Sequence, residues 1–285
     1  MPARILLLGK QPLKRRLAAG DLERMARRGA MDPAVIESAA ANHELALAAV
    51  RAACAGHHLV EKTVAEVAAI DADDVDLIVT AGGDGTVFTA NALAADRPMI
   101  TINSDPDRSI GHFTRCLADE FSERFADWLA GRTALERLPR LVARVLDDGS
   151  ERRILNDCLF TSSHPAAITR YLLEVDGQRE FQESSGVWIA TAAGSTGGIR
   201  SAGLMPPLMP QQDALLYKVR EPFPGRRLST LVEGRQEPPR GLRLTSAMAG
   251  VELYIDGPHQ AVPLKPGGSV EFGACAQPLR LVVAR

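Results

Sequence analysis

The segment from Asp76 to Thr86, Asp-Leu-Ile-Val-Thr-Ala-Gly-Gly-Asp-Gly-Thr, constrains the fold of this chain more than any other part of it. Apolar and β-branched residues run from Leu77 to Thr80 without polar alternation, which predicts a central strand covered on both faces. Apolar residues at helical spacing follow, namely Val87, Phe88, Ala90 and Leu93. A strand, a glycine turn and a helix in this order place the turn at the carboxyl end of a parallel sheet, where open α/β sheets bind ligands.

The first third of the chain repeats this alternation of strand and helix. Apolar runs at Ile5–Leu8 and Pro98–Ile102 predict two more strands, and an alanine-rich stretch from about Pro33 to Ala55 predicts a long helix that ends at Gly56. Helical spacing returns between Ala118 and Leu129. This pattern is typical of βαβ units, so we expect an α/β domain with a mainly parallel sheet over residues 1–131.

The remainder of the chain reads as short strands and turns. Leu141–Leu146 and Ile154–Phe160 flank an Asp-Asp-Gly turn and predict a hairpin, and strands followed by Asp-Gly turns recur at Tyr171–Gly177 and Val251–Gly257. Prolines and arginines accumulate over residues 204–241 and predict surface loops there. We therefore expect a second, mostly antiparallel β domain over residues 132–285.

The charge and cysteine content exclude several functional classes. The chain has 33 basic and 35 acidic residues, so no uniform field attracts nucleic acid or an anionic membrane surface, and neither partner is expected. The four cysteines lack Cys-x-x-Cys spacing, and the histidines lack metal-ligand spacing, which argues against zinc sites and disulfides. The first apolar run is too short for a signal peptide or a membrane span, and we expect a cytoplasmic protein.

The glycine turn has the composition of a phosphate-binding loop with an acid at its centre. Gly82, Gly83 and Gly85 leave backbone amides unobstructed, and the following helix adds partial positive charge at its start. Asp84 would repel phosphate unless it accepts the proton of an attacking hydroxyl or helps to hold Mg²⁺. Both roles imply phosphoryl transfer. The structural alternative is a tight strand-to-helix connection with Thr86 as the helix N-cap.

The same five residues resemble a signature shared by NAD kinases, diacylglycerol and sphingosine kinases and, in a related form, phosphofructokinases. Two further segments are similar to NAD kinase motifs: Asn156-Asp157 to an Asn-Glu pair, and Thr191–Thr196 to Thr-Pro-Thr-Gly-Ser-Thr. The Gly-Thr-Gly-Asn-Asp segment of the lipid kinases is replaced here by Ile102–Pro106. The chain is therefore identified as a member of the NAD kinase family, and the resemblance spans most of its length.

The resemblance implies an NAD kinase-like fold and Mg²⁺-dependent transfer of a phosphoryl group from ATP, or polyphosphate, to the 2′-hydroxyl of the adenosine ribose of NAD. Asp84 would be the base, and Gly82, Gly83, Gly85 and Thr86 would meet the donor phosphates. The residues expected to bind NAD are Asn156, Asp157, Ser185, Gly194, Thr196, His112 and Phe113. Arg108 is a candidate phosphate contact. The family further implies a homodimer or homotetramer.

Three departures from the family pattern affect the acceptor side. Gly198 stands where the family usually has an aromatic residue, Ser185 stands in place of an aspartate before a glycine, and Asn103–Phe113 is longer than the corresponding bacterial segment. The last two features look more like the mitochondrial-type branch. Lys10 either faces the site or simply ends the first strand.

Two other functions stay open at this point. One is a lipid kinase of the diacylglycerol type, and the other is a non-catalytic nucleotide-binding regulatory protein.

Overall fold

The computed structural model describes residues 2–18, 20–69, 74–203, 206–224 and 229–285. The chain divides into two compact units. The first comprises Met1–Glu136 with Arg280–Arg285, and the second comprises Arg137–Leu279. Of the described helices, none combines the length and the apolar character that a bilayer crossing requires.

The first unit is built on a seven-stranded sheet. Its strand order is β2 (His58–Thr63), β1 (Arg4–Gly9), β3 (Leu77–Gly82), β4 (Pro98–Asn103), β19 (Leu279–Val283) and β6 (Ala134–Leu138), and β5 (Cys116–Leu117) also pairs with β4. The pairs β1–β2, β1–β3, β3–β4, β4–β5 and β4–β19 are parallel. Every residue of β3 is buried, as the apolar run predicts.

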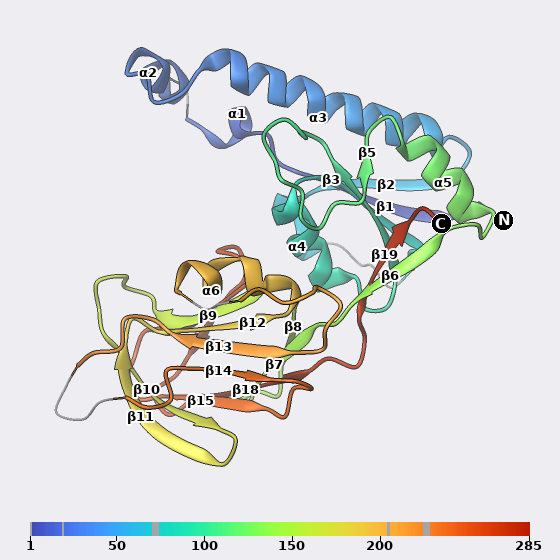
Figure 1. Ribbon diagram of the computed structural model, residues 1–285. Coiled ribbons are helices and arrows are strands. Elements are labelled where there is room, and N and C mark those ends of the chain that lie inside the picture. The colour runs from blue at the N-terminus through green and yellow to red at the C-terminus, as the bar shows by residue number, and fades with distance from the viewer. Residues whose placement is uncertain (1, 19, 70–73, 204–205, 225–228) are drawn as a thin grey trace. The chain divides into compact units, whose positions relative to one another are not determined.

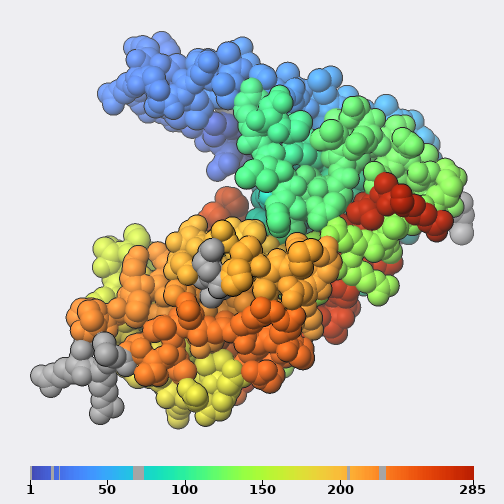
Figure 2. Space-filling view, viewed as in Figure 1, coloured from blue at the N-terminus to red at the C-terminus, as the bar shows by residue number. Residues whose placement is uncertain are grey.

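Helices cover both faces of this sheet. α3 (Pro33–Ala53) and α5 (Phe121–Leu129) pack their apolar residues on one face, and α4 (Asp84–Leu93) lies on the other (Figure 1). α3 starts where the sequence predicts, because the Asp32 carboxylate accepts a 2.9 Å hydrogen bond from the Ala34 amide and Pro33 occupies the first turn. The long helix forms a ridge along this unit in Figure 2. Shorter segments complete it, namely α1 (Leu13–Arg16), α2 (Asp21–Arg27) and the 3₁₀ helix η1 (Val64–Ala69).

The second unit is a sandwich of two antiparallel six-stranded sheets. One has the order β11 (Gln178–Ser184), β10 (Thr169–Val175), β15 (Leu242–Ser246), β18 (Ser269–Ala274), β7 (Leu141–Val145) and β8 (Glu151–Ile154). The other has the order β14 (Glu233–Gln236), β13 (Leu215–Val219), β12 (Val187–Thr191), β9 (Asp157–Ser162), β16 (Val251–Ile255) and β17 (Ala261–Leu264). Alternate residues of both sheets form one apolar core, which confirms the predicted antiparallel β architecture.

The hairpin predicted from Leu141–Leu146 and Ile154–Phe160 is wrong in its second arm. β7 pairs with β8, but the chain then leaves this sheet and β9 enters the other one. The crossing occurs at Leu155 and Asn156, whose amides donate to the carboxylate of Asp256 instead of to a neighbouring strand. A buried side chain thus ends one strand and allows the next to begin, a signal that apolar patterning does not carry.

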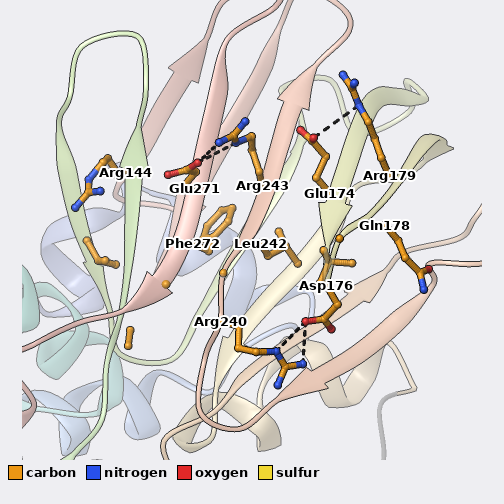
Figure 3. Close-up of a pocket in the computed structure, with 16 residues that line it drawn as sticks. Arg144, Glu174, Asp176, Gln178, Arg179, Arg240, Leu242, Arg243, Glu271 and Phe272 are labelled. Atoms are coloured by element: carbon orange, nitrogen blue, oxygen red, sulfur yellow. Dashed lines mark hydrogen bonds and ion pairs between the residues drawn. The ribbon is translucent and has the colours of Figure 1, made fainter.

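The outer face of the sheet that contains β10, β15 and β18 forms a wide hollow of about 1110 Å³ (Figure 3). Its charged side chains are paired within the face, as Arg240–Asp176, Arg243–Glu271, Arg179–Glu174 and Arg144–Glu151. None of the residues predicted to bind substrate lies in this hollow. Exposed ion pairs of this kind contribute little to stability and leave no uncompensated charge for a ligand.

Candidate active-site elements

The glycine turn joins β3 to α4 by a very close backbone approach. A Cβ atom on Gly82 would lie 2.1 Å from the Thr86 hydroxyl oxygen, and one on Gly83 would lie 2.8 Å from that of Ser109. Gly85 has open space around it. Two of the three glycines are therefore required by their surroundings, while the third leaves one side of the turn accessible to a ligand.

Thr86 is not the N-cap of α4. The helix begins at Asp84 and its N-cap is Gly83, which offers no capping side chain. The Thr86 side chain instead turns back onto Gly82 and is buried. The prediction that Thr86 caps the helix is therefore wrong. No side chain at the N-cap accepts a hydrogen bond from the first amides of α4.

The carboxylate of Asp84 is held by the segment that follows β4. Its two oxygens accept hydrogen bonds of 3.0 Å from the His112 amide and 2.7 Å from the Phe113 amide. Each carboxylate oxygen can accept a second bond, so Asp84 can still receive a hydroxyl proton. The hydrogen bonds from the two amides fix the orientation of the Asp84 carboxylate.

Residues 104–113, here called the strap, wrap around the glycine turn. The Asn103 side chain donates to the Ser109 carbonyl (3.0 Å) and accepts from the Asp105 amide (3.1 Å). Gly111 has φ +64°, and a Cβ there would lie 2.6 Å from the Asn103 amide nitrogen. The strap therefore adopts one conformation, set by Asn103 at the end of β4, that brings the amides of residues 112 and 113 onto Asp84.

Lys10 lies at the end of β1 beside the turn. Its Cβ would be 3.3 Å from a Cβ on Gly82, and burial lowers the pKa of its ammonium group, an effect that nearby Asp105 opposes. Within the described residues no carboxylate forms an ion pair with it. Arg108, in contrast, donates to Asp105 (2.8 Å) and to Ser38 (3.2 Å). Of the two cations, Lys10 is the one without a carboxylate partner.

His112 and Phe113 contribute differently. The Phe113 ring is buried against Phe88, with ring centres 5.2 Å apart, so its amide rather than its ring faces Asp84. The His112 Nε2 atom is buried and finds no hydrogen-bond partner in the described part of the chain. A buried nitrogen without a partner is a candidate ligand contact.

In the second unit, two sequence motifs lie directly against each other. Gly194, in the 3₁₀ turn η2 (Ala193–Thr196), packs so closely that a Cβ would lie 1.8 Å from the Asn156 carbonyl oxygen. A Cβ on Gly197 would lie 3.1 Å from the Asp157 carboxylate. The Asn156-Asp157 pair and the turn therefore form one local structure, although Gly194 follows Asn156 by 38 residues in the sequence.

Asp157 is a buried carboxylate with few partners. It accepts from the Asn156 side chain (3.1 Å) and from the Gly198 amide (3.2 Å), at the start of α6 (Gly198–Ser201). Burial raises its pKa to about 6, although the Gly198 amide acts in the opposite direction. It is ionised at neutral pH and retains lone pairs for hydroxyl donors. Thr196 is exposed at the edge of the same turn.

Two residues act here that the sequence analysis did not assign. Asp256 holds the amides of Leu155 and Asn156 and so positions the Asn156-Asp157 pair. Thr191 accepts from the Gly194 amide (3.0 Å) and donates to the Leu155 carbonyl (2.6 Å). Asp256 was visible only as part of an Asp-Gly hairpin turn, where its positive φ of 49° is ordinary turn geometry.

Comparison with known proteins agrees with this architecture. The chain is 27% identical over 234 residues to the probable NADH kinase of Oryza sativa subsp. japonica, covering 74% of this chain and 71% of that protein. It is 29% identical over 249 residues to the NAD kinase of Pseudomonas aeruginosa (strain PAO1), covering 79% and 80%. Residues 21–133 match the family model of the ATP-NAD kinase N-terminal domain.

Two solved structures have the same fold. The crystal structure of yeast NADH kinase complexed with NADH matches with a TM-score of 0.66 at 17% identity, covering 100% of this chain and 84% of that one. The structure of an NAD kinase from Archaeoglobus fulgidus in complex with ATP matches with a TM-score of 0.62 at 18% identity, covering 97% and 92%. An α/β unit followed by a β-sandwich unit is thus a fold that this chain shares with solved NAD(H) kinases. In fold, motifs and sequence, the chain is similar to the NAD kinases.

Proposed function

We propose that this protein is an NAD kinase that transfers the γ-phosphoryl group of ATP to the 2′-hydroxyl of the adenosine ribose of NAD, giving ADP and NADP. The observation that carries the proposal is the position of Asp84. Its carboxylate stands at the start of α4, within a turn of accessible backbone amides, and is aimed by the amides of His112 and Phe113. One turn thus supplies both a proton acceptor and phosphate-binding donors.

The donor phosphates would be bound by the amides at the start of α4 and by Lys10. Amides at a helix start point outward and favour negative charge. The ammonium group of Lys10 adds a charge beside Gly82, and no carboxylate of the described residues forms an ion pair with it. In the transfer step the ribose oxygen bonds to the γ-phosphorus, the bond to the β,γ-bridging oxygen breaks, and Asp84 takes the hydroxyl proton.

Mg²⁺ is expected to enter with the nucleotide. Among the described residues no cluster of three His, Cys, Asp or Glu side chains could hold a metal ion alone. A site with few protein ligands suits Mg²⁺, which commonly takes substrate phosphates and water with at most one or two carboxylates. Bound to the phosphates, the ion would neutralise charge on the oxygens, and Asp84 is a carboxylate within the glycine turn itself.

The acceptor would be bound by the second unit. Asp157 can accept from ribose hydroxyls, and the Asn156 side chain, the Gly194 turn and Thr196 add donors and acceptors beside it. Ser185 offers a neutral hydroxyl where the family usually has a carboxylate. The relatives from rice and Arabidopsis thaliana are named NADH kinases, so we propose that NADH is also accepted.

The test is NADP formation by the purified protein with NAD, Mg²⁺ and ATP, scored with an NADP-specific dehydrogenase. Parallel reactions replace ATP with polyphosphate, NAD with NADH, and NAD with diacylglycerol. We expect transfer to NAD by wild type and a loss of 10²-fold or more, on the order of a general-base contribution, in Asp84→Asn. Transfer to diacylglycerol alone would assign the protein to the lipid kinases, and binding of NAD without transfer would make it a regulatory binding protein.

We also propose that the protein assembles as a homodimer or homotetramer, as the family resemblance implies. Light scattering coupled to size-exclusion chromatography measures the mass directly. A monomeric mass of 30.6 kDa at the concentration of the kinase assay would reject this assignment.

A further inference from the structure

Two segments that follow neighbouring strands meet over the end of β3. In the sheet, β1 and β4 lie on either side of β3. Lys10 follows β1, and its amide donates a 2.9 Å hydrogen bond to the Ala81 carbonyl. Ser104 follows β4, and its amide donates a 3.0 Å hydrogen bond to the Gly82 carbonyl. Lys10 and Asp105, the next residue of the strap, therefore approach the glycine turn from opposite sides.

The carboxylate of Asp105 is buried and is held through one of its oxygens. The residue is 8% exposed. Its Oδ1 atom accepts from the guanidinium of Arg108 (2.8 Å) and from the Asn42 side chain on α3 (3.4 Å). Its backbone amide donates to the Asn103 side chain at the end of β4. The Oδ2 atom receives no hydrogen bond from the described residues, so this oxygen is available to a further cation.

Lys10 is a second cation that Asp105 influences. Burial lowers the pKa of its ammonium group, the charge of Asp105 raises that pKa, and the charge of Arg108 lowers it. On α3, burial and then the charge of Lys10 lower the pKa of His43 to about 4, so this ring is neutral. On α4, the Asp84 carboxylate is engaged by the strap amides. Among the described residues, Asp105 is thus the one that favours the charged form of Lys10.

We propose that Asp105 is a positioning residue for the donor phosphates, which acts through Lys10 by holding its ammonium group charged beside the glycine turn. The inference rests on the proposed function and adds a residue that does not itself touch ATP. A carboxylate at this place has two opposite effects: it preserves the charge of Lys10, and it repels the phosphates that Lys10 attracts. The first effect matters only where the lysine would otherwise lose its proton, so the balance depends on pH.

The test is the affinity of the whole protein for ATP with Mg²⁺, in the absence of NAD, measured by titration calorimetry from pH 7 to 9. At pH 7 we expect Asp105→Asn to bind ATP at least as tightly as wild type, because a repelling charge is removed while Lys10 is still protonated. As pH rises, the affinity should fall at a lower pH in the variant than in wild type. The loss should reach about tenfold, the usual effect of losing one charged contact. A merely structural role would lower the affinity by the same factor at every pH.

Three further variants assign the effect to Lys10. Asp107→Asn is the matched control, because it removes the same charge from an exposed position of the strap, and its pH profile should equal that of wild type. Arg108→Met should shift the fall in affinity to higher pH, since the charge of Arg108 lowers the pKa of Lys10. In Lys10→Met the affinity should be low, and the addition of Asp105→Asn should introduce no pH dependence.

Two results would overturn the inference. One is a ratio of wild-type to Asp105→Asn affinity that does not change with pH, and the other is a pH effect of Asp105→Asn that persists in Lys10→Met. Melting curves show whether each variant is folded. If Asp105→Asn does not fold, Arg108→Met carries the test, and an unshifted profile there rejects the inference.

The kinase assay is independent of these titrations. A protein that forms NADP but shows no change of the affinity ratio with pH remains a kinase and loses the role of Asp105. The expected change of the ratio in a protein that forms no NADP would reject the kinase and keep the link between Asp105 and Lys10.

Discussion

The amide of Phe113 donates a 2.7 Å hydrogen bond to the carboxylate of Asp84, 29 residues earlier in the chain. The proposed base therefore also holds the strap in place. Substitution of this residue should alter structure and chemistry together, and the two effects can be measured separately.

In Asp84→Asn, one of the two strap amides loses its acceptor, because an amide side chain presents only one oxygen. We expect faster hydrogen exchange at residues 112 and 113, by about tenfold, and unchanged exchange in α3. Mass spectrometry of exchanged peptides measures both. Ser109→Ala is the matched control, since the Ser109 side chain lies over Gly83 and not on Asp84. Equal protection of the strap in wild type and Asp84→Asn would refute this dual role.

Gly82→Ala should destabilise the first unit by about 1–3 kcal/mol, the usual cost of an overpacked site. The new methyl group would lie 2.1 Å from the Thr86 hydroxyl oxygen, on the buried side of the turn. Gly85→Ala is the control: it has open space and lies within α4, so we expect unchanged or slightly higher stability. Urea denaturation of the three proteins gives the comparison. A Gly82→Ala protein as stable as wild type would contradict the close packing.

Lys10→Met should raise the KM for ATP about tenfold or more and leave the KM for NAD nearly unchanged. Among the described residues no carboxylate forms an ion pair with this lysine, so the substitution breaks none of their ion pairs and the rise in KM reports phosphate binding. Arg108→Met is the comparison, because its guanidinium is already paired with Asp105. We expect a smaller change in the KM for ATP there. If Arg108→Met has the larger effect, the donor phosphates bind the strap and not the end of β1.

Asp157 should make NAD binding depend on pH. Burial raises its pKa to about 6 from 3.8, so the ionised acceptor is lost as pH falls through 6, and affinity should fall with it. Titration calorimetry from pH 5 to 8 measures this. In Asp157→Asn the profile should be flat and the affinity low throughout. A wild-type profile with no inflection near pH 6 would exclude Asp157 as the ionised contact.

The same shift predicts a change in stability with the opposite pH dependence. Between the unfolded pKa of 3.8 and the folded pKa of about 6, the folded state binds more protons, so unfolding becomes easier as pH rises through this window. Asp157→Asn should therefore be more stable than wild type by about 3 kcal/mol above pH 7 and match it near pH 3. Denaturation curves at the two pH values test the difference.

Much of the first unit follows from local sequence patterns. The buried strand at Leu77–Gly82, the turn and the start of α3 are set by neighbours in sequence, which is why they can be predicted. The position of the Thr86 side chain could not be predicted, because it packs into the space that the missing Cβ of Gly82 leaves free. The apolar pattern of Leu279–Val283 resembles that of the sandwich strands, and yet this strand pairs with β4 of the first unit. Its place between β4 and β6 depends on partners far away in the sequence.

The sequence predicts which segments belong to the candidate site, but it does not predict the contacts between those segments. The resemblance identified Asn156-Asp157 and the turn at Gly194, but only the structure shows that one packs on the other. Asp256 was missed because its role is to bind two backbone amides 100 residues away, a distance over which no spacing rule applies. The contact between Gly198 and Trp188, where a Cβ on Gly198 would lie 2.8 Å from the indole, likewise depends on which strand lies under the turn.

The contact between Gly198 and Trp188 also bears on how selectively this enzyme could be inhibited. A compound designed to stack on an aromatic residue that projects from the Gly194 turn would find no ring there in this protein. It would meet the indole of Trp188 from the strand below, with the guanidinium of Arg220 over the ring. Relatives that carry the aromatic residue in the turn would present a different surface to the same compound, so an anionic aromatic inhibitor could discriminate between them.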